Sequence, residues 1–244
     1  MEFQSFLERC RYIFGLNPEL PVPTDVQAEK LFVLTERMLK VNESMNLTAI
    51  TDVDGVILKH YADSLTISSY IPDSARLIDI GCGAGFPTLP LAIFRPDVKI
   101  VALDGTAKRI EYVRATAELL GLDNVTAIAG RAEEYANKPD YRESFDIATA
   151  RAVAALPVLA ELCIPFVKKN GAFIAMKAAQ GENEAAVAAN AIKLCGGSET
   201  ETVRIDLKGS NGSLDQRVIV KVSKTANTPA KYPRHYSQIS KKPL

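Results

Sequence analysis

Apolar residues recur at helical spacing through the first 72 residues of the chain. In residues 2–15 they fall three or four positions apart, which is the period of one buried helix face. Prolines then interrupt the pattern, and a second helix is predicted over residues 24–46, with Thr24 as N-cap and a glutamine three residues later. A third helix is predicted over residues 53–71, because a proline follows it. The chain is therefore expected to begin with a helical extension.

From residue 75 onward the pattern changes to short apolar runs separated by helical stretches. The runs predict five strands and then two later ones, at Leu77–Ile80, Val98–Leu103, Val125–Ala129, Phe145–Thr149, Ala172–Met176, and near Thr202–Asp206 and Arg217–Val222. Helical periodicity lies between them, at residues 88–95, 106–120, 153–164 and 182–194. This alternation predicts an α/β fold, a doubly wound seven-stranded sheet with helices on both faces. Ligands bind such sheets beyond the carboxyl ends of the strands.

Composition narrows the class of protein without identifying it. The 244 residues are 47% apolar and 24% charged, which excludes collagen, coiled coils and wholesale disorder. The four cysteines lack C-x-x-C spacing and only two histidines occur, so neither a metal site nor a disulfide framework is expected. Apolar runs are too short to cross a membrane, and the polar, acidic N-terminus is unlike a secretory signal. A cytoplasmic protein is expected.

Positive charge is concentrated at the C-terminal end. Lys plus Arg and Asp plus Glu are equal at 29 each, yet residues 216–244 hold seven Lys or Arg and no acid. Tyr232 and Tyr236 lie among these charges, so this end is suited to contact a polyanion such as RNA. Two alternatives are a solvated, mobile terminus and a Tyr-Pro-Arg segment that folds back onto the core. The expected organisation is a helical extension at 1–72, a core at 73–226 and a basic tail at 227–244.

A glycine-rich loop follows the first predicted strand. Gly81, Gly83 and Gly85 alternate with other residues, which lets the backbone turn tightly and approach a ligand closely. The dinucleotide pattern G-x-G-x-x-G fails because Phe86 stands where its third glycine is needed, and no phosphate-binding P-loop occurs. The spacing acid-x-Gly-x-Gly-x-Gly, which begins at Asp79, instead resembles the first motif of S-adenosylmethionine (AdoMet) methyltransferases.

Acidic residues also follow the next two predicted strands. Asp104 ends the second strand, where a carboxylate can accept both hydroxyls of a ribose, although NAD enzymes place an acid similarly. The third strand is followed by the polar run Gly-Arg-Ala-Glu, so that Ala132 and Glu133 lie where an adenine edge would be read. The glycine loop and these two positions occur in order at three successive strand ends. Together they favour AdoMet as the cofactor.

Two common methylation chemistries lack their residues in this chain. Exocyclic amines are commonly methylated by an (Asn/Asp)-Pro-Pro-aromatic loop after the fourth strand, where this chain has Thr-Ala-Arg-Ala at residues 149–152. Methylation of a pyrimidine carbon needs a cysteine nucleophile, and Cys82 is interpreted as a small filler of the glycine loop. A ring nitrogen such as guanine N7 has a free lone pair and needs no general base. The sequence is compatible with that target.

Several segments resemble the bacterial RsmG (GidB) family, which methylates guanine N7 in small-subunit ribosomal RNA with AdoMet. The similarity covers about residue 40 to the C-terminus, and its most specific parts are Asn-Leu-Thr at 46–48 and His-x-x-Asp-Ser-Leu at 60–65. The other matching segments are Asp79–Pro87, Arg131-Ala132-Glu133, Ala150-Arg151-Ala152, Lys177 and Tyr232-Pro233-Arg234. Two positions where the family has glycine differ, at Thr88 and Ala178.

The resemblance implies a class I AdoMet methyltransferase fold and a 16S ribosomal RNA or small-subunit substrate. It also implies that Gly81, Phe86, Ala132, Glu133 and Arg151 contact AdoMet, with Asp104 near the ribose. Catalytic residues are not assigned, and Arg151 and Lys177 are candidates for positioning the substrate. His60 and Asp63 have a simpler structural interpretation as residues that cap and pair, Arg151 as a surface ion-pair residue, and Lys177 as a structural ion pair.

Other functions stay open on the sequence alone. An AdoMet enzyme acting on a small molecule or protein would share the cofactor motifs, and so would a non-catalytic AdoMet- or RNA-binding protein. The affinity for an RNA bound through its phosphates would fall steeply as the salt concentration rises. That dependence would distinguish an RNA substrate from a small molecule or protein. Formation of S-adenosylhomocysteine would separate an enzyme from the second.

Overall fold

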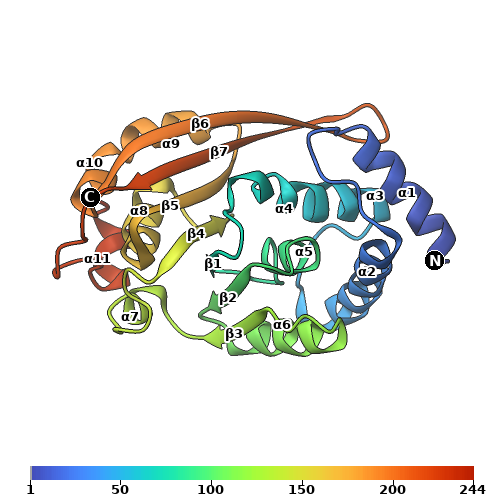
Figure 1. Cartoon of the computed structure of the whole chain (residues 1–244), viewed down its shortest axis with the longest axis horizontal. Coiled ribbons are helices and arrows are strands. Elements are labelled where there is room, and N and C mark those ends of the chain that lie inside the picture. The colour runs from blue at the N-terminus through green and yellow to red at the C-terminus, as the bar shows by residue number, and fades with distance from the viewer. Residues whose placement is uncertain (1) are drawn as a thin grey trace.

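A computed structural model describes residues 2–244, which form one seven-stranded sheet between two layers of helices (Figure 1). The strand order is β3-β2-β1-β4-β5-β7-β6. Strands β1 to β5 pair in parallel, and β7 runs antiparallel to both of its neighbours. The bounds are β1 Arg76–Ile80, β2 Lys99–Asp104, β3 Val125–Ala129, β4 Phe145–Arg151, β5 Val167–Ala178, β6 Gly197–Lys208 and β7 Leu214–Lys224. The order reverses between β1 and β4, so the switch point where α/β sheets bind ligands lies there.

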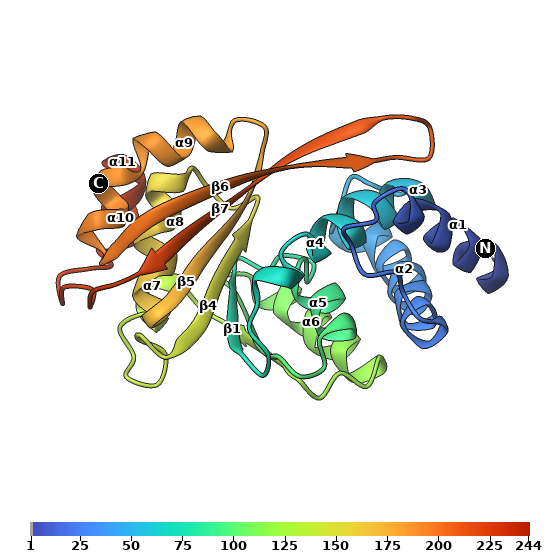
Figure 2. The ribbon, with the colours of Figure 1, turned by 45° about the horizontal axis from the view of Figure 1, so that its top comes forward.

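The two faces of the sheet bury separate apolar cores. Alternate residues of a strand point to opposite faces, so Leu77 packs on one side with the extension, and Ile78 packs on the other with the later helices. Figure 2 shows α8 to α11 on one side of the sheet and α1 to α6 on the other. The helices outside the extension are α5 Thr88–Phe94, α6 Ala107–Leu119, α7 Ala132–Tyr135, α8 Leu156–Cys163, η3 Ile164–Phe166, α9 Gly181–Val187, α10 Ala189–Leu194 and α11 Tyr236–Lys241.

The N-terminal extension is helical, as expected, but its third part is irregular. Helices α1 (Phe3–Gly15) and α2 (Asp25–Met45) match the predicted spans, and Thr24 and Gln27 form a complete capping box. The single helix expected over 53–71 runs without a break only over 53–65, and part of it is π-helical. It divides into α3 Val53–Val56, a π-helical segment η1 Ile57–Ala62, α4 Asp63–Leu65 and a 3-10 turn η2 Ser68–Tyr70.

Local side chains explain this irregular segment. Thr66 Oγ1 donates to the carbonyl of Asp63 at 2.7 Å and competes with the helical hydrogen bond that would continue α4. Side chains of η1 are buried on several sides, and a π-helical turn re-aims them by inserting one residue per turn. The predicted helix over 182–194 is also two helices, because the chain turns at Ala188 so that α9 packs on β7 and α10 on α8.

Strands β6 and β7 are longer than predicted and form an arm. Their hairpin extends past the other strands toward α1 and α3 (Figures 1 and 2). Asn17, after α1, exchanges two hydrogen bonds with the backbone of Lys208, and Ser210 donates to Asp54 at 2.5 Å. The arm therefore fastens the extension to the far edge of the sheet.

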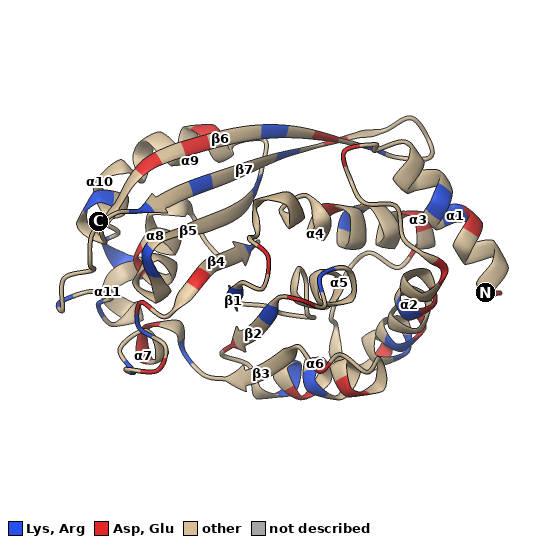
Figure 3. Cartoon of the chain, viewed as in Figure 1, with Lys and Arg blue, Asp and Glu red and all other residues tan. Residues whose placement is uncertain are grey.

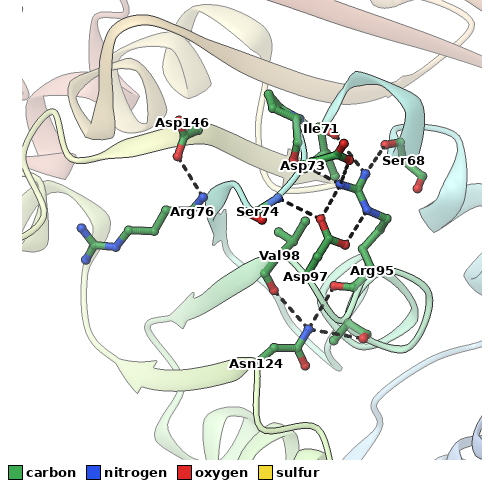
Figure 4. A network of polar contacts seen from close by, with 12 residues as sticks. Ser68, Ile71, Asp73, Ser74, Arg76, Arg95, Asp97, Val98, Asn124 and Asp146 are labelled. Carbon is green, nitrogen blue, oxygen red and sulfur yellow. Dashed lines mark hydrogen bonds and ion pairs between the residues drawn. The ribbon is translucent and has the colours of Figure 1, made fainter.

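A network of polar side chains lies at the amino edge of the sheet, where the parallel strands begin, and connects neighbouring segments of the chain (Figure 4). Arg95, after α5, donates to the carbonyls of Ser68, Ile71 and Pro72 and pairs with Asp97 at 2.8 Å. The Arg95 guanidinium holds the pKa of Asp97 well below its usual range. Beside this pair, the side-chain amide of one asparagine, Asn124, donates to three backbone carbonyls. This network joins the extension to the first strands.

The C-terminal segment folds back onto the core. Arg234 pairs with fully buried Glu161 of α8 at 2.6 Å, and Arg142 donates to the carbonyls of Tyr232 and Thr228. Tyr232 and Ile239 are buried. The Tyr-Pro-Arg segment therefore packs on the core, as one of the two alternatives expected. The other alternative, a solvated and mobile terminus, does not describe this region.

Most of the C-terminal positive charge has acidic partners elsewhere in the chain. Four of the seven basic residues form ion pairs with acids of other elements: Arg217 with Asp63, Lys221 with Glu201, Lys224 with Glu143 and Arg234 with Glu161. Basic and acidic residues are interspersed over α1, α2, α6 and the β6–β7 arm (Figure 3). Within residues 2–244, only Lys231, Lys241 and Lys242 of the seven form no ion pair.

Candidate active site

The three glycines of the loop after β1 serve three different purposes. All have positive φ, at 73° for Gly81, 56° for Gly83 and 88° for Gly85, a region that side chains rarely adopt. A Cβ on Gly85 would lie 2.6 Å from Leu89, so this glycine lets α5 pack on the loop. A Cβ on Gly81 would lie 2.6 Å from Val153. Only Gly83 faces open space, so its bare backbone is available to a ligand.

Asp104, at the end of β2, holds this loop in place. One carboxylate oxygen accepts a hydrogen bond from the Gly83 N–H at 3.0 Å and the other accepts one from the Thr106 N–H at 2.8 Å. Each carboxylate oxygen has a second lone pair, so the side chain can still accept from two ribose hydroxyls. Asp104 is thereby placed both to shape the loop and to bind a diol.

A pocket of about 280 Å³ lies against the ends of β1, β2 and β3. Of the predicted cofactor residues, Gly81, Asp104, Ala132 and Glu133 line it. The structure thus brings together side chains that lie more than 50 positions apart in the sequence. The sequence did not point to several further lining residues, among them Val153, Leu162 and Tyr236. The pocket combines a carboxylate diol acceptor, an exposed glycine backbone and apolar walls, which fits an adenosine group.

Phe86 and Arg151, predicted to bind the cofactor, lie on the other side of the loop. The ring of His60 stacks on Phe86 at 4.4 Å with an interplanar angle of 5°, and the Arg151 guanidinium lies 5.4 Å from the centre of the Phe86 ring. Arg151 donates to Asp63 at 2.9 Å, and Asp63 accepts a second bond from Arg217, also at 2.9 Å. One buried carboxylate therefore holds two arginines from different strands.

A second pocket, of about 460 Å³, is lined by these residues. It includes His60, Asp63, Arg151 and Arg217, together with Lys177 at the end of β5. Lys177 donates to Glu184 at 2.8 Å and to the carbonyl of Ala154 at 2.9 Å. Ala152 lines this pocket and its neighbour Val153 lines the first. The two pockets therefore adjoin across the segment that follows β4.

His60 is a neutral ring with one unused nitrogen. Its Nε2 lies 2.8 Å from Thr48 Oγ1, and this hydrogen bond joins the Asn-Leu-Thr segment to the His-x-x-Asp segment. Its Nδ1 is buried with no partner among the described residues. Burial, and secondarily the charge of Arg151, lowers the pKa of His60 to about 4. At neutral pH the ring therefore carries no charge, and its Nδ1 keeps unused hydrogen-bonding capacity.

Asp79, the acid that opens the glycine motif, is fully buried. One oxygen accepts from Thr88 Oγ1 at 2.6 Å, and the other has no partner within residues 2–244. Burial raises the pKa of Asp79 to about 6. Thr88 thus provides the only side-chain donor that this carboxyl has among the described residues.

Cysteine nucleophile and metal chemistry have no prepared site in the described part of the chain. All four cysteines are buried free thiols, and burial raises the pKa of Cys82 well above its usual range. Residues 2–244 contain no group of three or more His, Cys, Asp or Glu side chains that could hold a metal. Among those residues, no helix is long and apolar enough to cross a membrane.

Solved structures share the fold. An O-methyltransferase from Bacillus cereus, solved in complex with S-adenosylhomocysteine, aligns with a TM-score of 0.56 at 17% identity and covers 91% of this chain and 100% of its own. A putative O-methyltransferase from Klebsiella pneumoniae aligns with a TM-score of 0.54 at 18% identity, covering 90% of this chain and 98% of its own. These matches confirm the predicted class I methyltransferase fold.

Sequence comparison identifies the family. The family model described as rRNA small subunit methyltransferase G (GidB) matches residues 27–212. Proteins named ribosomal RNA small subunit methyltransferase G are 44% identical in Leuconostoc citreum, over 96% of this chain and 98% of the relative, and 40% identical in Lactobacillus delbrueckii, over 96% and 95%. The predicted family and AdoMet as cofactor are confirmed, and the alternative functions are not favoured. This chain belongs to the rRNA small subunit methyltransferase G family.

Proposed function

We propose that this protein methylates N7 of a guanine in the 16S ribosomal RNA of the small ribosomal subunit, with AdoMet as the methyl donor. The relatives carry the name of a small-subunit ribosomal RNA methyltransferase, which supports the substrate class. The observation that carries the proposal is the pair of adjoining pockets, one suited to adenosine and one lined by cations and an uncharged histidine. Such an enzyme acts where ribosomal subunits are, in the cytoplasm.

The cofactor would be held at the first three strand ends. Asp104 would accept the ribose hydroxyls, Ala132 and Glu133 would face the adenine, and Gly81 and Gly83 would let the backbone approach the methionyl part. Gly85 would support the site through the packing of α5 on the loop. Phe86 and Arg151 would form the boundary with the second pocket, where the methyl group is needed. AdoMet supplies an electrophilic methyl group on a sulfonium.

The second pocket would hold the guanine. Its carboxylates, Asp63 and Glu184, can accept from the N–H groups of a guanine Watson–Crick edge, and its cations, Arg151 and Lys177, can donate to O6. The pocket volume of about 460 Å³ is sufficient for a nucleobase. RNA-binding proteins commonly read bases splayed out of single-stranded loops, which would present N7 inside such a pocket.

Catalysis would consist mainly of positioning. Guanine N7 carries a lone pair and no proton, so no group has to remove one. The neutral His60 ring adds no positive charge beside a base that becomes cationic on methylation. Arg151, fixed by Asp63 and lying over Phe86, would keep the base and the donor in line. Alignment of this kind is worth several orders of magnitude in rate.

The decisive experiment is nucleoside mass spectrometry of 16S ribosomal RNA from cells with and without the gene. Loss of one 7-methylguanosine is expected, and an unchanged set of methylated nucleosides would contradict the proposal. Purified enzyme with naked 16S RNA and with small subunits would then show which form is the substrate.

Substitution of Arg151 tests the guanine pocket directly. Arg151→Ala is expected to lower RNA methylation by about 100-fold, because the base and donor lose their alignment. Asp63 keeps Arg217 as a partner, so the variant is expected to fold. Arg114→Ala, which removes an exposed arginine of α6 that pairs with Glu111 and donates to the Ala127 carbonyl, is the matched control and should retain full activity. Full activity of Arg151→Ala would place the target elsewhere.

A further inference from the structure

A tyrosine from the C-terminal helix lines the cofactor pocket. Tyr236 opens α11 and is the one aromatic residue among those that line the 280 Å³ pocket. The Arg131 guanidinium lies 5.7 Å from the centre of its ring. Tyr236 is 39% exposed, although Arg234 before it pairs with Glu161 and Ile239 after it is buried. An aromatic ring left partly exposed at the wall of a pocket is available to cover a flat ligand.

The C-terminal segment holds this ring in a fixed place. Arg234, two residues earlier, donates from its backbone and its side chain to Glu161, at distances of 2.6–2.8 Å. His235 caps α11 by accepting from the Ser237 N–H, and Ile239 on the same helix is fully buried. The positions on either side of Tyr236 are therefore both anchored, so the ring is presented to the pocket by a structured element.

The opposite residues of the pocket define which part of a ligand the ring would meet. Asp104 marks the ribose position, and Ala132 and Glu133, beyond β3, mark the adenine end. The Arg131 guanidinium, 5.7 Å from the centre of the Tyr236 ring, extends beside Gly105, so the ring lies at the ends of β2 and β3, the side of the pocket that includes the adenine end. Base–aromatic stacking requires a flat ring at that end, and the remaining walls supply only aliphatic or polar groups.

We propose that Tyr236 is a cofactor-binding residue that covers the adenine of AdoMet, so that the C-terminal segment completes the cofactor site. This inference rests on the placement of AdoMet in the 280 Å³ pocket. It also changes the interpretation of the basic tail, in which an aromatic ring among lysines was expected to stack on RNA. The segment then closes the donor pocket through Tyr236.

Titration calorimetry with AdoMet tests the proposal on three variants of the full chain. Tyr236→Ala is expected to weaken AdoMet binding about tenfold, the effect of losing one base–aromatic stack. Tyr236→Phe keeps the ring and should bind within about twofold of the wild type. Tyr12→Ala removes an exposed tyrosine of α1, at the opposite end of the molecule (Figure 1), and should change nothing. Equal affinities of Tyr236→Ala and wild type would overturn the proposal.

A fluorescent reporter gives an independent readout, because the chain contains no tryptophan. Tyr236→Trp introduces one, and stacking on adenine should quench its emission saturably with the same affinity that calorimetry measures. Tyr12→Trp is the matched control and should not respond to AdoMet. If Tyr236→Trp binds AdoMet with unchanged affinity and its fluorescence does not change, the proposal is contradicted.

Asp104→Ala, measured in parallel, separates this proposal from the placement of the cofactor. Losing the charged hydrogen bonds should weaken AdoMet by roughly 5- to 150-fold. If Asp104→Ala weakens AdoMet and Tyr236→Ala does not, the tyrosine proposal alone fails. If neither variant weakens AdoMet, the cofactor lies in another pocket. Weaker RNA binding by Tyr236→Ala with unchanged AdoMet affinity would assign the ring to the RNA and overturn the proposal.

Discussion

The two edges of the sheet are built on opposite principles. At the amino edge, Arg95 and Asn124 direct their donors to backbone carbonyls and acidic partners within hydrogen-bond distance. At the carboxyl edge, His60 Nδ1 and Asp79 Oδ1 are buried without partners among the described residues. Buried polar groups normally find partners, and each exception requires an explanation. The donors of Arg95 and Asn124 are thus satisfied, whereas two buried groups at the carboxyl edge keep free hydrogen-bonding capacity. The third such group in residues 2–244, the Tyr112 hydroxyl, lies on α6.

This difference separates the residues that stabilise the fold from those that prepare the site. A buried polar group without a partner costs about 1–3 kcal/mol, and the fold can tolerate that cost only where other interactions exceed it. Networks such as that of Arg95 supply such interactions away from the chemistry. Substitutions at the amino edge should therefore change stability and leave ligand binding intact, whereas those in the glycine loop at the carboxyl edge should mainly change ligand binding.

The largest effect on binding is expected at the glycine loop. Gly83→Val should remove measurable AdoMet binding, because a branched side chain would fill the open space that the loop leaves for the cofactor. The positive φ adds about 1–2 kcal/mol of strain. Gly121→Val is a matched control, since Gly121 also has a positive φ and open space around it but lies after α6. Calorimetry should detect loss of AdoMet binding in Gly83→Val and not in Gly121→Val. If Gly83→Val still binds AdoMet, the cofactor site does not include this part of the loop.

A smaller effect, on stability, is expected from the buried acid of the carboxyl edge. The pKa of Asp79 is raised to about 6 from 3.8, so its contribution is complete below pH 3.8 and is lost as pH rises through 6. The loss amounts to about 3 kcal/mol by pH 7. The depressed pKa of His60, about 4, acts in the opposite direction, since its contribution is complete above pH 6.5 and is lost as pH falls toward 4.

Asp79→Asn separates these two opposing contributions. In the wild type they largely cancel between pH 4 and 6.5, whereas in the variant only that of His60 remains. The free energy of unfolding of Asp79→Asn should therefore rise with pH relative to the wild type over this window. Denaturant titrations at several pH values measure the two slopes, and parallel curves would show that Asp79 does not titrate there.

The smallest of these effects is expected at the amino edge. Arg95→Ala should lower the free energy of unfolding by about 2 kcal/mol, because three carbonyls and Asp97 lose their donor. AdoMet affinity should stay within about twofold of the wild type. Arg114→Ala, the exposed control on α6, should cost less than about 0.5 kcal/mol. A loss of AdoMet affinity in Arg95→Ala equal to its loss of stability would remove the distinction between the edges.

Local chemistry explains why much of the core could be predicted from the sequence. Short apolar runs alternate with helical periodicity, the capping residues Thr24 and Gln27 are adjacent to the helix they begin, and the glycine loop directly follows its strand. These signals act within a few residues, so they remain visible in the sequence. The proximity of Asp104 and Glu133 could also be predicted, because the carboxyl ends of parallel strands meet at the same edge of the sheet.

The remaining features depend on contacts that sequence order hides. Glu161 neutralises Arg234 from 73 positions away, so counting charges along the tail suggested a free basic end that the structure does not have. Arg217 reaches Asp63 only because β7 pairs with β5, a register that its apolar pattern did not reveal. The π-helical segment containing His60 adds one residue to a turn and leaves the apolar spacing ambiguous. Long-range pairing, and not local propensity, decides each of these.

The position of Tyr236 in the chain has a consequence for synthesis. The first walls of its pocket come from residues near Ile80 and the last from Tyr236, after all seven strands. A chain emerging from the ribosome therefore has no complete pocket until translation has passed all seven strands and reached Tyr236. The elements that fix the glycine loop are made early, whereas the ring that closes it arrives late. Occupancy of this pocket would accordingly report that translation of the chain has reached its C-terminal helix.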